Sequence, residues 1–285
     1  MSSQCEQDAR RPIGVFDSGL GGLTVVRQIQ ATMPAEDIVY LGDSARVPYG
    51  IKSPRTIRQF ALQDAAFLAR FDPKVIVVAC NTASAVAMDA LRRHVAVETV
   101  DVVAPAAAEA VRVAKGRPIG VIGTEATIAS GAYGRAIATL APAVEMIAAA
   151  APLLVPIVEE GWAQDDPIVL HVLTRYLHDL QRVRPGVLIL GCTHYPLLAE
   201  AIGKLMGPDT RLLDTGRAAA EQVRRHLTSG GGARRGGQGT LRCFSTDNPD
   251  RFAALAERFL GRSAGEVGWV GTDELAAAGH GAAEI

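Results

Sequence analysis

The sequence carries almost no net charge, and no apolar run in it approaches the length of a membrane span. The formal net charge is −1, so no strong electrostatic attraction to nucleic acid or to an anionic membrane is expected. The apolar runs have the length of β-strands, well below the roughly 20 residues of a membrane-spanning helix. These absences argue against a nucleic-acid-binding protein and against a membrane protein.

Targeting and metal-binding patterns are also missing. The segment MSSQCEQDARRP at residues 1–12 has no apolar core, so we expect no signal peptide and a cytoplasmic protein with reduced thiols. The chain has four cysteines, without a C-x-x-C pair or a Cys/His ligand spacing: Cys5, Cys80, Cys192 and Cys243. No metal site is therefore expected. Cys5 lies near a chain end and Cys243 in a plausible buried strand, and neither is assigned a function.

Short apolar segments rich in β-branched residues are abundant, by contrast. They occupy residues 13–17, 37–41, 75–79, 119–123, 144–148, 187–190 and 211–214. Helix-like stretches lie between them, and two of these begin with Ser53-Pro54 and Asp166-Pro167, a pattern typical of helix starts. Continuous apolar strands that alternate with helices indicate parallel sheets covered on both faces, so the predicted fold class is α/β.

The sequence also resembles itself. PIGVFDSG at residues 12–19 is echoed by PIGVIGTE at 118–125, and ACNTAS at 79–84 is echoed by GCTHYP at 191–196. A weaker echo links two alanine-rich segments, APAAAEAV and DTGRAAAEQV, in the same order along the chain. Three echoes at nearly one spacing predict two pseudo-symmetric, doubly wound α/β lobes.

The echoes also suggest how the chain divides. The first lobe is expected to comprise residues 12–103 and 216–275, and the second lobe residues 104–215. Residues 1–11 and 276–285 are expected to be flexible tails. Ligands of parallel α/β sheets bind outside the carboxyl ends of the strands, so we predict an active site in the cleft between the lobes.

Two cysteines end apolar runs at matching places in the two halves: Cys80 precedes Asn-Thr, and Cys192 precedes Thr-His. A free cysteine that ends a strand is usually a small, buried apolar residue. Two cysteines at duplicated positions instead favour chemistry, with two thiols that face each other across the cleft. Such a pair could remove a proton from one face of a carbon and return one to the other face, as racemisation requires.

The usual cofactor of racemisation, pyridoxal phosphate, is tethered by a lysine. The chain has only four lysines, and none follows a recognisable cofactor motif: Lys52, Lys74, Lys115 and Lys204. The glycine-rich segment DSGLGG is neither a Walker A loop nor a G-x-G-x-x-G motif, so it is a weak candidate for phosphate binding. No cofactor is therefore expected.

Six motifs resemble, in order and spacing, those of the glutamate racemases: GVFDSGLGGLTV, YLGDSARVPYG, ACNTAS, VIGTEATIASGAY, PLLVPIVEEG and GCTHYPLL. The resemblance covers roughly residues 12–275, and it departs from the usual pattern at Ala151 and in the glycine-rich linker at 229–239. It implies a cofactor-independent isomerase that interconverts L- and D-glutamate by two-base proton transfer. It also implies a supply of D-glutamate for peptidoglycan, and hence for cell-wall biogenesis and cell shape, and a homodimer in the cytoplasm.

The resemblance further implies roles for individual residues. Cys80 would deprotonate D-glutamate with help from Asp17, and Cys192 would deprotonate L-glutamate with help from His194. Glu159 would orient His194. The implied substrate contacts are Asp17, Ser18, Tyr49, Gly50, Asn81, Thr82, Thr124, Thr193 and His194.

Other interpretations of the same residues remain open. Asp17 could be a helix N-cap, Tyr49 and Gly50 could form a turn, and Glu159 could lie on a solvated helix face. The whole chain could be an aspartate or hydantoin racemase of the same superfamily. It could also be a two-lobed binding protein without catalysis, or a thiol redox protein that joins its two cleft cysteines in a disulfide.

Overall fold

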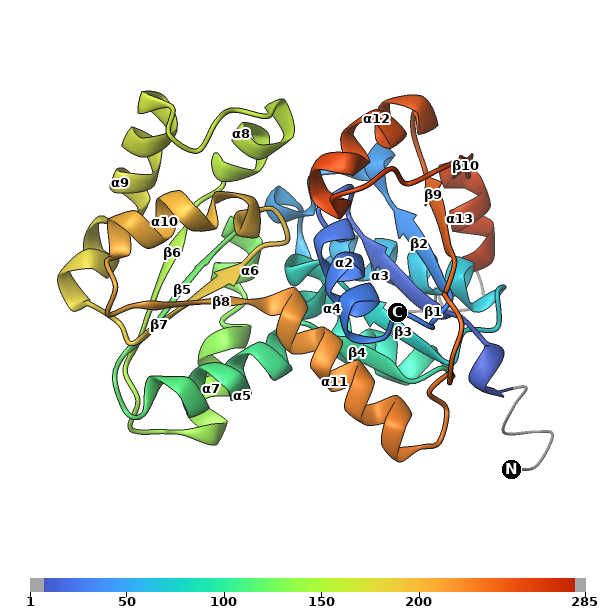
Figure 1. Cartoon of the computed structure of the whole chain (residues 1–285), viewed down its shortest axis with the longest axis horizontal. Helices are drawn as coiled ribbons and strands as arrows, with labels where there is room; N and C mark the ends of the chain where they lie inside the picture. Colours follow the sequence, from blue (N-terminus) through green and yellow to red (C-terminus); the bar gives the residue numbers. More distant parts are fainter. Residues whose placement is uncertain (1–7, 280–285) are drawn as a thin grey trace.

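The computed structural model describes residues 8–279, which form two parallel β-sheets side by side, each enclosed by helices (Figure 1). The first sheet has the strand order β10-β9-β2-β1-β3-β4, and all neighbouring strands are parallel. Its strands are β1 (Ile13–Asp17), β2 (Ile38–Gly42), β3 (Val75–Val78), β4 (Thr99–Asp101), β9 (Leu241–Ser245) and β10 (Val267–Trp269).

The second sheet has the order β6-β5-β7-β8 and is also entirely parallel. Its strands are β5 (Ile119–Gly123), β6 (Met146–Ala150), β7 (Val187–Gly191) and β8 (Arg211–Asp214). This order repeats the β2-β1-β3-β4 part of the first sheet, strand for strand along the chain. The repeat confirms the predicted α/β class with two pseudo-symmetric lobes.

Helices cover both faces of the first sheet. Val15 of β1 belongs to a core shared with α2, α11 and α12, while the next residue, Phe16, belongs to the core shared with α3, α4 and α13. This alternation follows from the period of two in a strand. The helices are α2 (Leu23–Thr32), α3 (Pro54–Ala69), α4 (Asn81–His94), α11 (Thr215–Ser229), α12 (Pro249–Leu260) and α13 (Thr272–Gly279).

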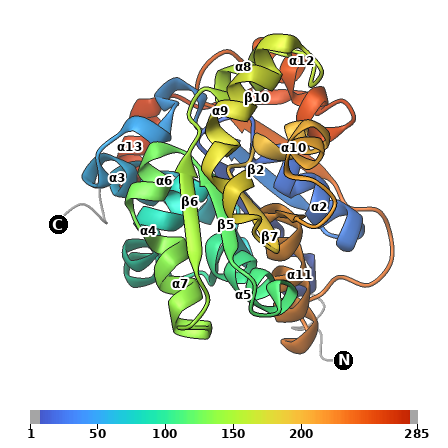
Figure 2. The same ribbon diagram turned by 90° about the vertical axis from the view of Figure 1, so that its left-hand side faces the viewer.

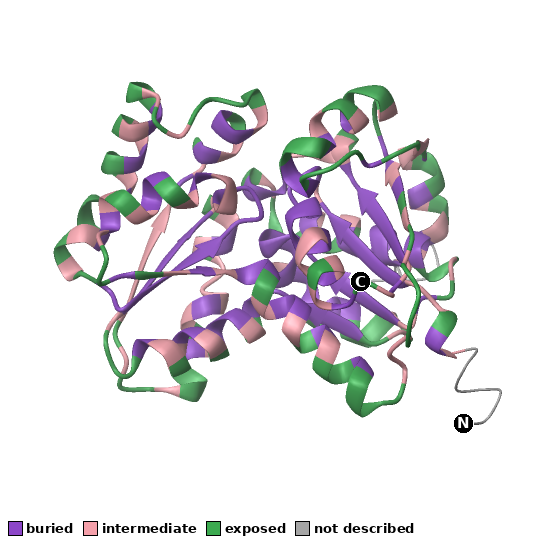
Figure 3. Cartoon of the chain, viewed as in Figure 1, coloured by how far each residue is buried: buried purple, intermediate pink, exposed green. Residues whose placement is uncertain are grey.

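The second sheet is covered in the same way. Figure 2, which looks onto this lobe, shows α5 and α7 below the strands and α9 and α10 above them. Its helices are α5 (Val103–Ala114), α6 (Glu125–Ala129), α7 (Ala132–Leu140), α8 (Leu154–Glu160), α9 (Pro167–Val183) and α10 (Ala199–Met206). Three short 3-10 turns complete the described elements: η1 (Ser44–Arg46), η2 (Tyr49–Ile51) and η3 (Tyr195–Leu198). Buried residues concentrate in the central strands of both sheets, β1, β2 and β3 in the first and β5 and β7 in the second (Figure 3).

Both predicted helix starts are confirmed. Ser53 caps α3 by accepting a hydrogen bond from the Thr56 backbone N–H, and Asp166 caps α9 by accepting one from Ile168. In each helix a proline occupies the first turn, where its missing N–H has no intrahelical partner to lose.

Some predicted boundaries are wrong. The apolar run predicted at 144–148 forms β6 two residues later, and the three-residue strands β4 and β10 were not expected. Residues 276–279 belong to α13 rather than to a tail, because α13 packs against α3 and buries Leu275 fully. Arg11 is also anchored, since it donates to the backbone oxygens of Asp72 and Pro73. Cys5 and the outer parts of both predicted tails lie outside the described residues.

Strand membership supports the proposed division of the chain into two lobes. Strands from residues 13–101 and 241–269 form the first sheet, and strands from 119–214 form the second. Within residues 8–279, no helix is both long enough and apolar enough to cross a bilayer.

Candidate active site

A cavity of about 110 Å³ lies between the lobes, at the carboxyl ends of the central strands. Cys80 follows β3 and Cys192 follows β7, and both thiols line this cavity from opposite lobes. The other lining residues proposed for the site are Ser18, Tyr49, Gly50, Asn81, Thr82, Thr124, Glu159, Thr193 and His194. Asp17 is the one proposed site residue outside the lining, and it directly precedes Ser18. The fold therefore gathers residues from six separate segments around one small space.

Cys80 is the N-cap residue of helix α4. Its Sγ accepts a hydrogen bond from the Ala83 backbone N–H at 3.5 Å, as an N-cap side chain does, and lies 3.7 Å from Ser18 Oγ. Burial, reinforced by the nearby charge of Asp17, raises the pKa of Cys80 to about 12. Without substrate, Cys80 is therefore a neutral thiol that can donate its proton.

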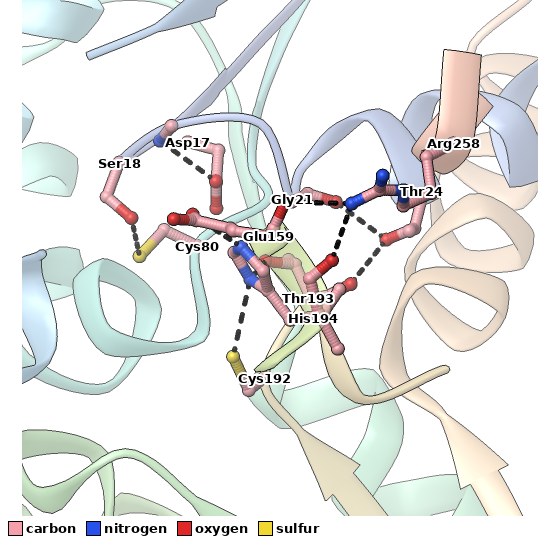
Figure 4. A network of polar contacts seen from close by, with 12 residues as sticks. Asp17, Ser18, Gly21, Thr24, Cys80, Glu159, Cys192, Thr193, His194 and Arg258 are labelled. Carbon is pink, nitrogen blue, oxygen red and sulfur yellow. Dashed lines mark hydrogen bonds and ion pairs between the residues drawn. The ribbon is translucent and has the colours of Figure 1, made fainter. Parts of the chain in front are cut away.

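Asp17 ends strand β1 beside Cys80 and is almost completely buried (Figure 4). Its Oδ2 accepts a hydrogen bond from the Gly19 backbone N–H at 3.1 Å, while its Oδ1 has no hydrogen-bond partner. Burial raises the pKa of Asp17, although the charge of His194 and the amides of Gly19 and Gly22 oppose this. An unpaired, buried carboxylate oxygen is costly, so Asp17 has a site ready to take a proton.

Cys192 begins a chain of three polar side chains. Its Sγ lies 3.8 Å from His194 Nδ1, and His194 Nε2 lies 3.0 Å from Glu159 Oε1 (Figure 4). Burial alone would lower the pKa of His194, but the hydrogen bonds to Cys192 and Glu159 outweigh it and raise the pKa to about 10. At neutral pH His194 is thus an imidazolium, which donates to Glu159 and places a positive charge beside the Cys192 sulfur.

Threonine hydroxyls join the lobes at the cavity wall. Thr82 of α4 lies 2.9 Å from Thr124 and 3.1 Å from Thr127, measured between Oγ1 atoms, and Thr124 caps helix α6. Gly50 packs directly against them, since a Cβ at this position would lie 2.7 Å from Thr124 Cβ. These hydroxyls can donate to a substrate carboxylate.

Two predicted substrate contacts, Tyr49 and Asn81, have polar side-chain atoms that are already hydrogen-bonded to other residues of the protein. The Tyr49 hydroxyl lies 2.5 Å from Asp43 Oδ2 and 2.9 Å from Asp64 Oδ2, inside a buried network that also holds Arg46. The side-chain amide of Asn81 accepts from the Tyr133 hydroxyl at 2.6 Å and donates to Thr215. Tyr49 and Asn81 therefore line the cavity, but the Tyr49 hydroxyl and the Asn81 side-chain amide are bound to other residues.

The cavity holds no arginine among the described residues. Arg46, from one of the resembling motifs, pairs instead with Asp43 and Asp64 beneath the wall. The first turn of α4 supplies backbone donors where an arginine is absent. The N–H groups of Asn81 and Thr82 have no intrahelical partner, and both residues line the cavity at the N-terminus of the helix. Such backbone donors suit a carboxylate.

Several residues around the site were not found from the sequence. Thr24 Oγ1 lies 3.0 Å from the backbone oxygen of Thr193, and Gly21 approaches the same segment so closely that a Cβ would lie 2.2 Å from Thr193 Oγ1. The Gly-Gly pair in DSGLGG was the available signal for this close approach. Arg258 and Phe259 reach the site from α12, and no motif marks them.

Comparison with known proteins identifies the class of protein. The sequence pattern of the family described as Asp/Glu/Hydantoin racemase matches residues 13–223. The chain is thus an amino-acid racemase, an isomerase. No group of three or more His, Cys, Asp or Glu side chains in the described part of the chain could hold a metal ion.

Individual relatives narrow the class. A glutamate racemase of Geobacter metallireducens is 44% identical and covers 90% of this chain and 95% of its own length. The structure of a Francisella tularensis glutamate racemase with D-glutamate has a TM-score of 0.86 at 38% identity and covers 93% of this chain and 99% of its own. A Thermus thermophilus glutamate racemase with β-chloro-D-alanine gives 0.85 at 44% identity, with 94% and 99% coverage. The chain belongs to the glutamate racemase family.

Proposed function

We propose that this protein interconverts L- and D-glutamate by transferring protons between Cα and two cysteines, without a cofactor. The observation that carries the proposal is the pair of thiols. Cys80 and Cys192 occupy equivalent strand ends of two repeated lobes, and both line one cavity. Substrate placed between them would present opposite faces of Cα to the two sulfur atoms.

With L-glutamate, the thiolate of Cys192 takes the Cα proton, so that the C–H electron pair is left on the substrate as a carbanion. The Cys80 thiol then gives its proton to the opposite face, which forms D-glutamate and leaves a thiolate on Cys80. The resting state suits this direction, because Cys80 is a neutral thiol and His194 is an imidazolium beside Cys192.

The reverse direction needs a thiolate on Cys80, whose raised pKa opposes its formation. Asp17 lies next to it with an unpaired carboxylate oxygen and a raised pKa, so it can accept the proton that Cys80 releases. We assign Asp17 this role for D-glutamate, and we assign His194, oriented by Glu159, the matching role for Cys192.

The remaining polar groups bind the substrate and stabilise the carbanion. We assign contacts to Ser18, Thr82, Thr124 and Thr193 through their hydroxyls, and to Tyr49, Gly50 and Asn81 through the backbone around the cavity. An arginine would stabilise the ground state and the carbanion alike, which would not lower the barrier. Donors in a small, dry cavity can favour the charge that develops on the α-carboxylate.

We further propose that the protein works in the cytoplasm as a homodimer and supplies D-glutamate for peptidoglycan. The resemblance to glutamate racemases supports this role. The cellular role is tested by expression in a bacterial strain that needs external D-glutamate, where growth without the supplement is expected. Light scattering during size-exclusion chromatography measures the oligomeric state, and a monomer mass would contradict the dimer.

Isotope labelling tests the two-base reaction. L-glutamate incubated in deuterated water, without added cofactor, should give D-glutamate that carries deuterium at Cα from the first turnovers. Unreacted L-glutamate should stay largely protonated early on, because Cys192 returns the proton that it removed. Chiral chromatography with mass spectrometry measures both pools. Early D-glutamate that retains the original proton would show that one base serves both faces.

A further inference from the structure

Helix α12 belongs to the first lobe but reaches the catalytic side chains of the second. It packs on α2, β9 and β10, and its C-terminal turn carries Arg258 and Phe259 next to each other in the sequence. Both side chains extend across the boundary between the lobes: Arg258 reaches α8, the helix that carries Glu159 (Figure 4), and Phe259 reaches His194.

Arg258 binds the end of α8. Its Nη1 lies 3.0 Å from the backbone oxygen of Val158 and 2.8 Å from that of Glu159. These carbonyls are among the last four of the helix: the Val158 oxygen also accepts from the Gly161 backbone N–H at 3.1 Å, and a cation beside them is favoured by the helix dipole. Gly161 leaves room for the contact, since a Cβ there would lie 2.3 Å from Arg258 Nη2. The guanidinium therefore fixes the backbone from which Glu159 projects.

Phe259 fixes the other partner. Its ring is fully buried and meets the His194 imidazole edge-on, with 5.3 Å between ring centroids and an interplanar angle of 81°. Adjacent residues of α12 thus hold the two ends of the 3.0 Å contact between Glu159 and His194. Both contacts lie on the Cys192 side of the cavity.

We propose that Arg258 is a positioning residue that holds Glu159 against His194 and thereby supports proton transfer at Cys192 rather than at Cys80. The proposal rests on the two-base reaction proposed above. Without this contact, the end of α8 is free to shift, and the His194 imidazolium loses its fixed orientation toward the thiolate. Positional errors of about 1 Å can cost on the order of 100-fold in rate.

An asymmetric role leaves a distinctive kinetic signature. L- and D-glutamate are mirror images with equal free energies, so any variant must lose the same factor of kcat/KM in both directions. Isotope effects on kcat/KM, by contrast, can differ between the two directions. If proton transfer at Cys192 becomes slower, the isotope effect on kcat/KM for Cα-deuterated L-glutamate should rise. The effect for Cα-deuterated D-glutamate should fall, because transfer at Cys80 then precedes the slow step.

The experiment compares three variants with the unchanged protein. Arg258→Gln should lose about 10-fold to 100-fold in kcat/KM and shift the two isotope effects in opposite directions. Arg258→Lys, which keeps a cationic donor, should recover part of both changes. Arg251→Gln is the matched control, because Arg251 is exposed on the same helix and its substitution should leave rates and isotope effects unchanged. Thermal unfolding of each variant checks the fold.

Two outcomes would overturn the proposal. A loss of activity in Arg258→Gln with unchanged isotope effects would show a general structural role. A larger isotope effect for Cα-deuterated D-glutamate in Arg258→Gln would show that the slowed proton transfer is the one at Cys80. Failure of the two-base reaction itself would be seen separately, in the unchanged protein, as early product that keeps its original Cα proton.

Discussion

At the scale of single residues, the two thiols are equivalent in position but differ in their neighbours. Cys80 has a carboxylate, Asp17, that can accept a proton, while Cys192 has an imidazolium that stabilises negative charge. In general, such a divergence separates acid and base roles between two chemically identical groups. In the two-base reaction that we propose, it gives each face of the substrate its own proton carrier.

Removal of either thiol should abolish racemisation. Cys80→Ala and Cys192→Ala should each lower kcat by at least about 100-fold, the usual contribution of a positioned acid or base. Cys243→Ala is the control, because Cys243 is equally buried but lies in β9, away from the cavity. Each substitution should destabilise the fold by only about 1 kcal/mol. Chiral chromatography and thermal unfolding measure the two effects, and near-normal activity in either cavity variant would refute the mechanism.

The raised pKa of His194 predicts the alkaline limb of the pH profile. His194 stays protonated below its pKa of about 10, so kcat/KM for L-glutamate should fall as pH rises through that value. Glu159→Gln removes a partner that raises this pKa, so the limb should move to lower pH. Because the same substrate is used, its own amino group cannot cause the difference. A limb at the same pH in both proteins would show that His194 does not control it.

Residue types and positions pointed to the two cysteines, and the resemblance to the glutamate racemases supplied the other proposed site residues, but side-chain directions could not be predicted. Cys80 and Cys192 stood out because each ends an apolar strand in a duplicated setting. The sequence around Tyr49 did not indicate that its hydroxyl would bind the buried carboxylates of Asp43 and Asp64, which lie 6 and 15 positions away. Such partners are set by tertiary packing, which a motif does not encode.

At the scale of elements, long apolar strands and capped helices could be predicted, while short ones could not. A strand of three residues such as β4 or β10 shows no periodicity, and its place is set by the neighbour with which it pairs. The contact between α12 and α8 was equally hidden, because Arg258 reaches across 99 positions to Glu159. The repetition of one lobe in the other, by contrast, was predicted by the echo between the two halves, although the order of the strands was not.

The turn between β1 and α2 should tolerate no side chain at Gly21. A Cβ at this position would lie 2.2 Å from Thr193 Oγ1 and 2.6 Å from His194 Nδ1, so Gly21→Ala must displace one of them. We expect kcat to fall by on the order of 100-fold, with the fold retained. Gly203→Ala is the control, since this glycine lies in α10 with ordinary space around it, and alanine should stabilise that helix by roughly 0.5–1 kcal/mol. Equal activity of the two variants would contradict the prediction.

At the scale of the whole molecule, hydrogen bonds across the boundary fix the distance between the lobes. The Tyr133 hydroxyl donates to Asn81 Oδ1 at 2.6 Å, Thr82 meets Thr124 at 2.9 Å, and Thr24 meets the Thr193 backbone at 3.0 Å. One core also continues from the first sheet into the second, because α2, α9 and α12 contribute to the same cluster. The width of the cavity is therefore a property of the whole fold.

A fixed width predicts strong selection by substrate length. Glutamate can place its two carboxylates against donors from both lobes, whereas aspartate, one methylene shorter, cannot reach both sets at once. A site whose buried donors stay unpaired rejects the shorter substrate by more than the lost methylene alone would, so kcat/KM for aspartate should be lower by at least about 1,000-fold. Chiral chromatography with each L-amino acid, at equal protein concentration, measures the ratio. Tyr133→Phe removes one of the hydrogen bonds between the lobes, and it should lower the ratio of kcat/KM for glutamate to kcat/KM for aspartate. Comparable turnover of aspartate and glutamate by the unchanged protein would show that the lobes close to fit the substrate, and that their separation does not set specificity.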